Sequence, residues 1–366
     1  MTPGATIRAA ALAGLVLLSG PDRLAACAFH TALPEATVSQ QIAGAIEIVA
    51  ARPAADNPFR FEPVAVLKGP ASASRPPHLV DSATRTRLAR HPGEAVLFAR
   101  EADGSWTRLL ILDAATRPLV DRMIARAGAW TGPGGEAERR DTFASLLVHP
   151  DDHVRRLALR ELDALPYDVL RGGTYPVAAA ELLDGIADIQ EMPFAPIRIL
   201  LLGLDGGSAA DAVIRARLVR LAASGTDLHL GAWITAAIES GGPDGVTEIE
   251  RLYLGTPGRL TEAQLTQLVR ALSEQSAGGD PALRAALDGA LRRLVSLRPE
   301  AAPLIAQAFG ANADYSQTRL VSELVAARAF TDRAGLMAAA AYITQARNSG
   351  GAVSASARPG LLPQKE

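Results

Sequence analysis

Hydrophobic and polar positions divide the chain into two parts with different periods. From about residue 40 to 113, apolar residues alternate with polar ones or form short runs between turn residues, which is typical of β-strands. Beyond residue 136 the apolar positions recur every three or four residues, which is typical of amphipathic helices. The chain therefore predicts a small β module followed by a larger helical part.

The β module, residues 38–116, is expected to contain five short strands. The predicted strands are 42–51, 59–69, 78–81, 94–101 and 105–113. The turn sequence "ADG" joins the last two, so they should form a hairpin. Five strands of this length suit a small antiparallel barrel or sandwich, because closing the sheet removes exposed edges.

A helix and a linker, residues 117–135, separate the module from the helical part. The segment "RPLVDRMIARAGAW" at 117–130 is amphipathic, and "TGPGGE" at 131–136 is rich in helix-breaking residues. We place the domain boundary in this linker.

The helical part, residues 136–347, is expected to be a row of helical hairpins with short connections. Thr261 and Gln264 have the spacing of a capping box at the start of one helix. The predicted helices are 136–148, 151–165, 175–188, 195–204, 208–223, 229–240, 243–254, 261–276, 281–297, 299–309, 316–329 and 331–347.

A short motif recurs at the start of several of these helices. "DDHVR" at 151–155, "DAVIR" at 211–215 and "DPALR" at 280–284 share an Asp, two free positions, an aliphatic residue and an Arg, and "DGVTE" at 244–248 keeps only the Asp. Successive Asp residues from position 211 onward are 33 and 36 residues apart, which is in the range of stacked helix pairs. The interval before them is 60 residues, so an irregular repeat is expected around 166–194.

With Leu146 and Leu147 before it and Leu157, Ala158 and Leu162 after it, the first copy resembles the HEAT family, including the "HVRRLALRELDAL" form of bacterial HEAT-like repeats. The resemblance implies an α-solenoid over about 136–347. It also implies that the Asp of each motif caps the second helix of its hairpin and that the Arg can reach the corresponding Asp of an adjacent repeat. The residues concerned are Asp151, Arg155, Asp211, Arg215, Asp280 and Arg284.

The β module has a looser resemblance of its own. "VLKG" at 66–69 closes the second expected strand and "PGE" at 92–94 opens the fourth, as in a bacterial group related to the netrin and tissue-inhibitor modules. That resemblance implies an OB-like barrel with inhibitor-like binding. The Cys-x-Cys and disulfide partners of that group are absent apart from Cys27, and a β module that only contributes structure is the alternative.

The first 26 residues are expected to be a secretory signal. One Arg precedes an apolar run from Ala9 to Leu18 that is too short to cross a bilayer. The following "LAAC" resembles the lipobox of bacterial lipoproteins, and Cys27, the only cysteine, would carry the lipid. Cleavage after Ala28 would instead give a plain periplasmic protein. Both alternatives place the protein outside the cytoplasm, in the periplasm or anchored to the envelope.

Composition narrows the functional classes. The formal net charge is -2 over 366 residues and the basic residues are scattered. The sequence therefore shows no basic stripe of the kind that binds nucleic acid. The tail, residues 348–366, is rich in Gly, Pro and small residues and is expected to be disordered.

The stretch around Pro150 has two interpretations. His149, Asp151, Asp152 and His153 are metal-ligand types, but Pro150 prevents the two histidines from sharing one helix face, which favours a capped turn between helices. No nucleophile elbow, phosphate loop, dinucleotide fingerprint or zinc-protease motif is found in the sequence. We therefore predict no catalytic, cofactor-binding or metal-binding residue, and no cofactor. The remaining histidines are isolated in sequence: His30, His78, His91 and His229.

The sequence thus predicts a non-enzymatic protein-binding or scaffolding protein of the bacterial cell envelope that acts through the solenoid surface. Its partner would be another protein, and contact with the membrane would occur only through a lipid anchor. One alternative is a HEAT-like cofactor lyase or accessory enzyme with an apolar tetrapyrrole pocket lined by His229 and Trp233. Another is inhibitor-like binding by the β module.

Overall fold

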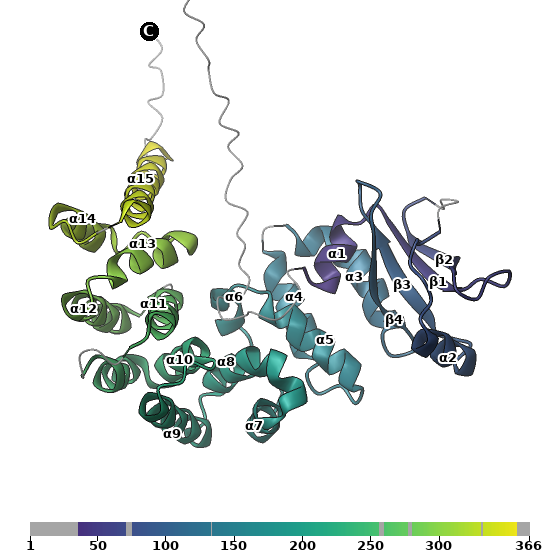
Figure 1. Ribbon diagram of the computed structural model, residues 1–366, viewed down its shortest axis with the longest axis horizontal. Helices are drawn as coiled ribbons and strands as arrows, with labels where there is room; N and C mark the ends of the chain where they lie inside the picture. The colour runs from purple at the N-terminus through teal and green to yellow at the C-terminus, as the bar shows by residue number, and fades with distance from the viewer. Residues whose placement is uncertain are drawn as a thin grey trace, which may run out of the picture.

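The computed structural model describes residues 36–70, 75–132, 134–255, 260–276, 280–330 and 332–356. This part of the chain is mostly helical, with fifteen α-helices and one small antiparallel sheet near the N-terminus. The sheet lies at one end of the molecule, and the later helices curve away from it in an open arc (Figure 1). The expected signal sequence, Cys27 and His30 lie outside the described residues. None of the described helices is both long and apolar enough to cross a membrane.

The sheet has four strands in the order β2-β1-β3-β4, all antiparallel. They are β1 (Glu47–Pro53), β2 (Phe61–Lys68), β3 (Ala95–Arg100) and β4 (Trp106–Leu112). The hairpin expected from "ADG" is confirmed, because β3 pairs with β4. Since β2 and β4 are the two ends of the order, the sheet is open, and the expected barrel or sandwich is wrong.

The third expected strand, 78–81, is also wrong. Residues 78–81 make one isolated bridge, between Arg60 and Leu79, and then lead into α2 (Ser82–Arg90). Asp81 caps this helix by accepting a hydrogen bond from the Thr84 backbone N–H at 2.7 Å. In the same way, the first three residues of the expected strand 42–51 belong to α1 (Val38–Gly44), which starts with a capping box between Thr37 and Gln40. In both segments, a side chain that caps a helix N-terminus favours a helix where the alternating pattern predicted a strand.

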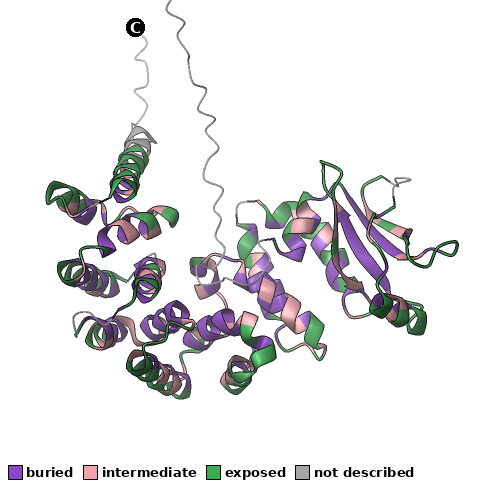
Figure 2. Cartoon of the chain, viewed as in Figure 1, coloured by how far each residue is buried: buried purple, intermediate pink, exposed green. Residues whose placement is uncertain are grey.

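The two central strands, β1 and β3, are buried on both faces, which explains their continuous apolar runs, whereas the edge strands β2 and β4 are partly exposed (Figure 2). Ile48, Ala50, Leu97 and Ala99 belong to the main core, with residues of α1 and α3 (Arg117–Trp130). The alternate residues Val49, Ala51, Val96 and Phe98 form a second cluster with Phe61, Val80 and Leu88. The sheet is therefore a central layer between helices.

The helical part begins with α4 (Gly135–Ala144) and α5 (Asp152–Asp163). The short helices α6 (Tyr167–Arg171) and η1 (Ile189–Phe194), which the sequence pattern did not predict, flank α7 (Ala179–Ala187). The later helices lie within a few residues of their expected positions: α8 (Ala195–Asp205), α9 (Ser208–Ser224), α10 (Leu230–Ile249), η2 (Glu250–Leu254), α11 (Glu262–Ser276), α12 (Pro281–Leu297), α13 (Ala301–Ala311), α14 (Thr318–Ala326) and α15 (Arg333–Ser356).

Two of these elements differ in detail from the expectation. Helix α10 spans both segments expected at 229–240 and 243–254, but Gly242 has φ 55° and ψ -135° and precedes Pro243, so the helix turns back there. A side chain on Gly245 would lie 2.4 Å from the Ala237 carbonyl oxygen, which shows how closely the two halves pack. Helix α15 continues to Ser356, beyond residue 348 where the tail was expected to begin, and 357–366 lie outside the described residues.

Successive hairpins contact each other in a regular way. Helices α8, α10, α11, α13 and α15 are neighbours in that order, with α9, α12 and α14 packed beside them (Figure 1). Gln267 accepts from Gly231 N–H at 2.9 Å, Gln275 donates to the Thr235 carbonyl at 2.9 Å, and Asn312 donates to Ser273 Oγ at 3.0 Å. These three bonds join residues 36, 40 and 39 positions apart. The first two bonds join α10 to α11, and the third joins α11 to the end of α13.

A buried ion pair between α4 and α5 is hydrogen-bonded to the start of the β module. Glu161 of α5 is fully buried, and its carboxylate accepts from Ser39 N–H at 2.8 Å, Ser39 Oγ at 2.5 Å and Arg139 Nη2 at 2.6 Å. Arg139 of α4 also donates to Thr37 Oγ1 at 3.0 Å. Because a buried charge requires hydrogen-bonding partners, this network fixes α1 against α4 and α5.

Replacing Glu161 by Gln should destabilise the protein strongly. Glu161→Gln leaves the guanidinium of Arg139 buried without its counter-charge, which typically costs about 3–5 kcal/mol. We expect a corresponding loss in the free energy of unfolding measured by urea titration. The milder Ser39→Ala, which removes one hydrogen bond from the carboxylate, should cost about 1 kcal/mol.

The matched control for this prediction is Glu138→Gln. Glu138 pairs with Arg126 at the surface, where such pairs contribute little, so its unfolding curve should coincide with that of the wild type. Equal effects of Glu161→Gln and Glu138→Gln would show that the joint does not depend on the buried pair.

Candidate functional site

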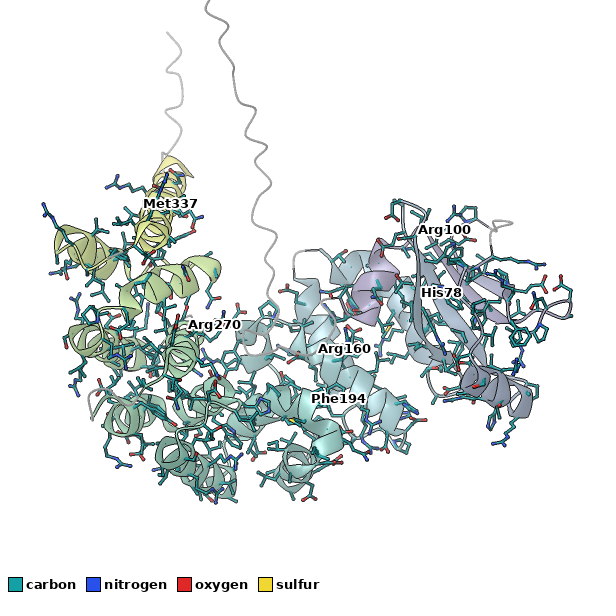
Figure 3. All side chains as sticks on the ribbon, viewed as in Figure 1. His78, Arg100, Arg160, Phe194, Arg270 and Met337 are labelled. Carbon is teal, nitrogen blue, oxygen red and sulfur yellow. The ribbon has the colours of Figure 1, made fainter. Side chains whose placement is uncertain are left out.

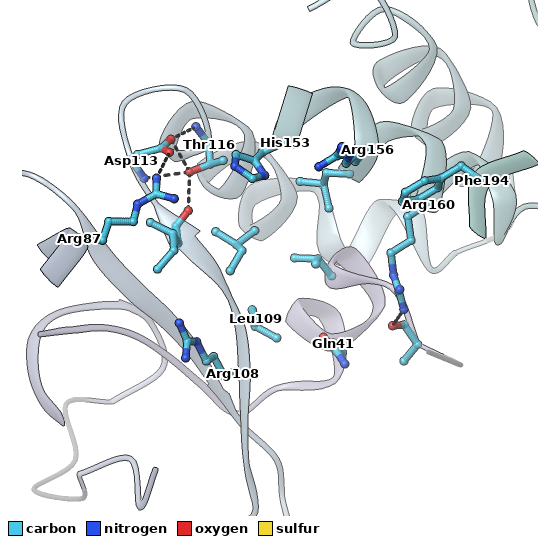
Figure 4. A pocket seen from close by; sticks show the side chains of 15 residues that line it. Gln41, Arg87, Arg108, Leu109, Asp113, Thr116, His153, Arg156, Arg160 and Phe194 are labelled. Atoms are coloured by element: carbon cyan, nitrogen blue, oxygen red, sulfur yellow. Dashed lines mark hydrogen bonds and ion pairs between the residues drawn. The ribbon is translucent and has the colours of Figure 1, made fainter. Parts of the chain in front are cut away.

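A cleft of about 440 Å³ lies between the sheet and α5 (Figure 4). Four consecutive residues of β4, at 108–111, form one wall. Four residues of α5 form the opposite wall, and α1 and η1 contribute at the ends. The lining residues are Ala36, Val38, Gln41, Arg87, Arg108, Leu109, Leu110, Ile111, Asp113, Thr116, His153, Arg156, Leu157, Arg160 and Phe194.

The α5 wall is one face of an amphipathic helix. His153, Arg156, Leu157 and Arg160 are spaced by three, four and seven residues from the first, so their side chains share one face. The buried side of the same helix carries Val154, Ala158, Glu161 and Leu162. The burial of that side, including the pair between Glu161 and Arg139, therefore turns a basic stripe toward β4.

The cleft is rich in positive charge. Its lining contains four arginines and His153 but only one carboxylate, that of Asp113. Arg87 and Arg108 come from the sheet side, and Arg156 and Arg160 come from the α5 side (Figure 4). Most of the other lining residues are apolar, so the surface combines cationic and hydrophobic groups.

Hydrogen bonds hold these guanidinium groups in place. Arg108 lies 3.1 Å from Asp81 and Arg156 lies 2.6 Å from Glu191. Arg160 donates to the Ala36 carbonyl oxygen at 2.9 Å. Each contact orients an arginine that still lines the cleft, so the cationic surface is formed before any ligand arrives.

Two carboxylates that support the walls remain ionised at neutral pH. Burial raises the pKa of Glu191, but hydrogen bonds from Arg198 at 2.8 Å and Arg156 at 2.6 Å outweigh it, so the net pKa is below its usual range. Burial also raises the pKa of Asp113, and hydrogen bonds from Thr116 and Ala115 lower it by more. The negative charge of Glu191 therefore offsets the positive charge of Arg156, and the negative charge of Asp113 offsets the positive charge of Arg87.

The motif aspartates occupy different positions in their helices. Asp151 is the N-cap of α5 and accepts from His153 N–H at 2.8 Å, and Asp280 is the N-cap of α12 and accepts from Ala282 N–H at 2.9 Å. Asp211, in contrast, is not the N-cap of its helix, so the prediction that it caps α9 is wrong. Helix α9 starts one turn earlier, with Gly207 as its N-cap, because Gly206 in a left-handed conformation ends α8 and the chain turns there.

At two of the three motif positions, the Arg does not make the expected contact with the corresponding Asp of an adjacent repeat. Arg155 donates to the His149 carbonyl at 2.6 Å and contacts Asp152 of its own helix. Arg215 binds Asp211 four residues before it, and Asp211 also accepts from Ser240 Oγ at 3.1 Å. Both arginines lie close enough to a carboxylate of their own helix to pair locally. Arg284 lies on the exposed side of α12.

The residues of the metal hypothesis form a turn. His149 Nδ1 accepts from Asp151 N–H at 3.1 Å, and His153 faces the cleft (Figure 4). Within the described ranges, no group of three or more His, Cys, Asp or Glu side chains is arranged to hold a metal ion.

The other isolated aromatic and histidine residues lie away from the cleft. Trp233 is buried in the core, with the Arg217 guanidinium 6.0 Å from its ring centroid. His229 precedes α10 in a left-handed conformation with φ 55°. His78 packs 5.2 Å from the ring of Phe98, on the sheet (Figure 3). His91 follows α2.

The cleft was not predicted from the sequence. Its α5 wall could have been recognised from basic residues at helical spacing on one face. Its β4 wall could not, because the two walls are more than 40 residues apart and the strand order decides which edge is free. The chain matches no family model, and no curated protein or solved structure is significantly similar to it. The function therefore has to be argued from this geometry.

Acidification should weaken the ion pairs of Glu191 with Arg156 and Arg198, which hold η1 at one end of the cleft. Since the pKa of Glu191 is lowered in the folded protein, its stabilising contribution is present above the unfolded-state pKa of about 4.3 and is lost as the pH falls through the folded value. We expect the free energy of unfolding of the wild type to fall between pH 5 and pH 3. In Glu191→Gln the protein should be less stable at pH 6 and its pH dependence flatter. Urea titrations across this range measure both, and identical slopes would contradict the assigned role of Glu191.

Proposed function

We propose that this protein is a non-enzymatic protein-binding or scaffolding protein whose helical part acts as a HEAT-like α-solenoid. The main support is the row of neighbouring helices α8, α10, α11, α13 and α15, with side-chain hydrogen bonds from α10 to α11 and from α11 to α13. Each pair contacts its neighbours along the row, and such stacking produces one extended, rigid surface on which many side chains contribute to binding.

A polar network stiffens the first part of this surface. Tyr167 and Arg171 of α6 both donate to Glu239 Oε2 of α10 at 2.9 Å, and Arg171 also binds Gln275 of α11. The network crosses three helices that are far apart in the sequence. A partner that binds a surface held in this way loses little free energy in ordering it.

The binding surface that we propose is the exposed stripe on the inner helices α11, α13 and α15. Arg270 of α11 and Met337 of α15 are exposed, Met337 to 63% (Figure 3). Gln307 of α13 is also exposed, as is Leu336 of α15, to 45%. By contrast, α8 and the first half of α10 are almost completely buried. The stripe combines a charge with large apolar side chains, as protein interfaces do.

The proposed setting is the bacterial cell envelope. The support is the N-terminal sequence, with its short apolar run and the lipobox-like residues that end at Cys27. In this proposal the partner is another protein of the envelope, and the membrane is contacted only through a lipid anchor.

The proposal predicts that inner-stripe variants lose a partner that outer-row variants keep. Full-length exported protein is used to capture partners from envelope extract after chemical cross-linking. We expect a specific protein whose recovery falls at least tenfold when Arg270→Glu is combined with Met337→Asp. The control Arg220→Glu repeats the charge reversal of Arg270→Glu on the exposed side of α9 and should leave recovery unchanged.

Two results would contradict this function. One is that no protein is enriched over a mock capture. The other is that Arg220→Glu reduces recovery as much as the inner variants do.

A further inference from the structure

We propose that the cleft between β4 and α5 binds an extended, acidic segment of a partner protein, which adds as a strand to the free edge of β4. This inference rests on the proposed protein-binding function and adds to it a second site and the chemistry of the segment bound there. The carboxylates of the segment would lie against Arg108, Arg156 and Arg160.

The first step of the argument is the free edge of β4. In the strand order β2-β1-β3-β4, β4 is an end strand, and no described strand lies beside its outer side. An end strand presents unpaired backbone N–H and C=O groups, which proteins usually cover or block. Here residues 108–111 of that strand line an open cleft instead.

The opposite edge of the sheet differs. β2 contains Pro63, which has no backbone N–H, and its pairing with β1 has two register shifts. Proline in a sheet is found at edges with its nitrogen facing outward, where it removes a donor. The β2 edge is thus unsuited to adding a strand, whereas β4 has no proline and one register shift in its pairing with β3.

The second step is the space beside the edge. The cleft, about 440 Å³, falls in the range of about 300–1,000 Å³ that is typical of ligand pockets. Helix α5 closes the side of the cleft that faces β4, and residues 108–111 line its other side. An extended segment fits this shape, because main-chain bonds to a strand edge give affinity and side-chain pockets give selectivity.

The third step is charge complementarity. Arg108 lies on β4, and Arg156 and Arg160 lie on α5. Arg108 pairs with Asp81 and Arg156 with Glu191, both outside the lining, which itself contains one carboxylate. Arginine binds carboxylates through paired, charge-assisted hydrogen bonds. Apolar residues, among them Leu157 and Phe194, line the same cleft. Because successive side chains of a strand point to opposite sides, a segment that alternates acidic and apolar residues matches both kinds of group.

The test uses the full-length protein and three synthetic ten-residue peptides. The first alternates Val and Glu, the second alternates Val and Lys, and the third repeats the first with alternate backbone nitrogens methylated. We expect the Val-Glu peptide to bind, and the other two to bind at least tenfold more weakly in fluorescence anisotropy. Hydrogen exchange should show new protection in residues 106–112 when the Val-Glu peptide is present.

Variants connect the binding to the cleft. Arg108→Glu and Arg156→Glu should each weaken binding of the Val-Glu peptide at least tenfold. Arg122→Glu, on the exposed side of α3 and outside the cleft, is the matched control and should bind like the wild type.

Several results would overturn the inference. If the Val-Glu peptide does not bind while the partner sensitive to Arg270 is still captured, the cleft proposal is wrong and the proposed function stands. Protection in α11 or α15 without protection in β4 would place the peptide elsewhere. If residues 106–112 are already as protected in the free chain as with peptide, another part of this chain or a second copy covers the edge. If free glutamate competes as well as the peptide, the cleft is a simple anion site.

Discussion

The buried carboxylate of Glu161 is the interaction on which the arrangement of this protein depends. It receives hydrogen bonds from Ser39 of α1 and from Arg139 of α4, so it ties the sheet-bearing module to the first helices of the array. A buried ion pair of this kind contributes little net stability, but its loss is costly because one charge stays behind without its partner. Its main effect is therefore to specify one orientation of the two parts.

The orientation matters because the cleft is made by both parts. The buried side of α5 packs into the core through Val154, Ala158 and Leu162 and carries the pair with Arg139, so Arg156 and Arg160 lie on the side that lines the cleft. The helical array then extends away from this joint, with side-chain hydrogen bonds from α10 to α11 and from α11 to α13. A partner protein could thus contact the array with a folded surface and reach the sheet edge with an extended segment. Binding at two linked sites would raise the overall affinity beyond that of either one.

The sequence predicted the helical part better than the sheet-bearing part. Hydrophobic periodicity located most helices from α8 onward within a few residues, because each has one buried face and a strong turn signal at its end. Periodicity predicted the wrong element where a capping residue starts a helix inside a segment of alternating apolar and polar residues, as after Asp81 and Thr37. It also missed α6 and η1, which are too short to show a period. The buried role of Glu161 could not be predicted, because its partner Ser39 is 122 residues away. The free β4 edge depends on strand order, which the pattern does not determine.

The most direct test of the account is site-specific photo-cross-linking of the full-length protein in intact envelopes. A photoreactive side chain would be placed in turn at Leu109 in the cleft, at Met337 on the inner stripe and at Val219 on the outer row, all of which are partly or fully exposed. The account predicts that the first two positions cross-link to the same protein and that Val219 does not. Cross-links from Val219 alone, or from none of the three, would contradict binding through the inner stripe and the cleft.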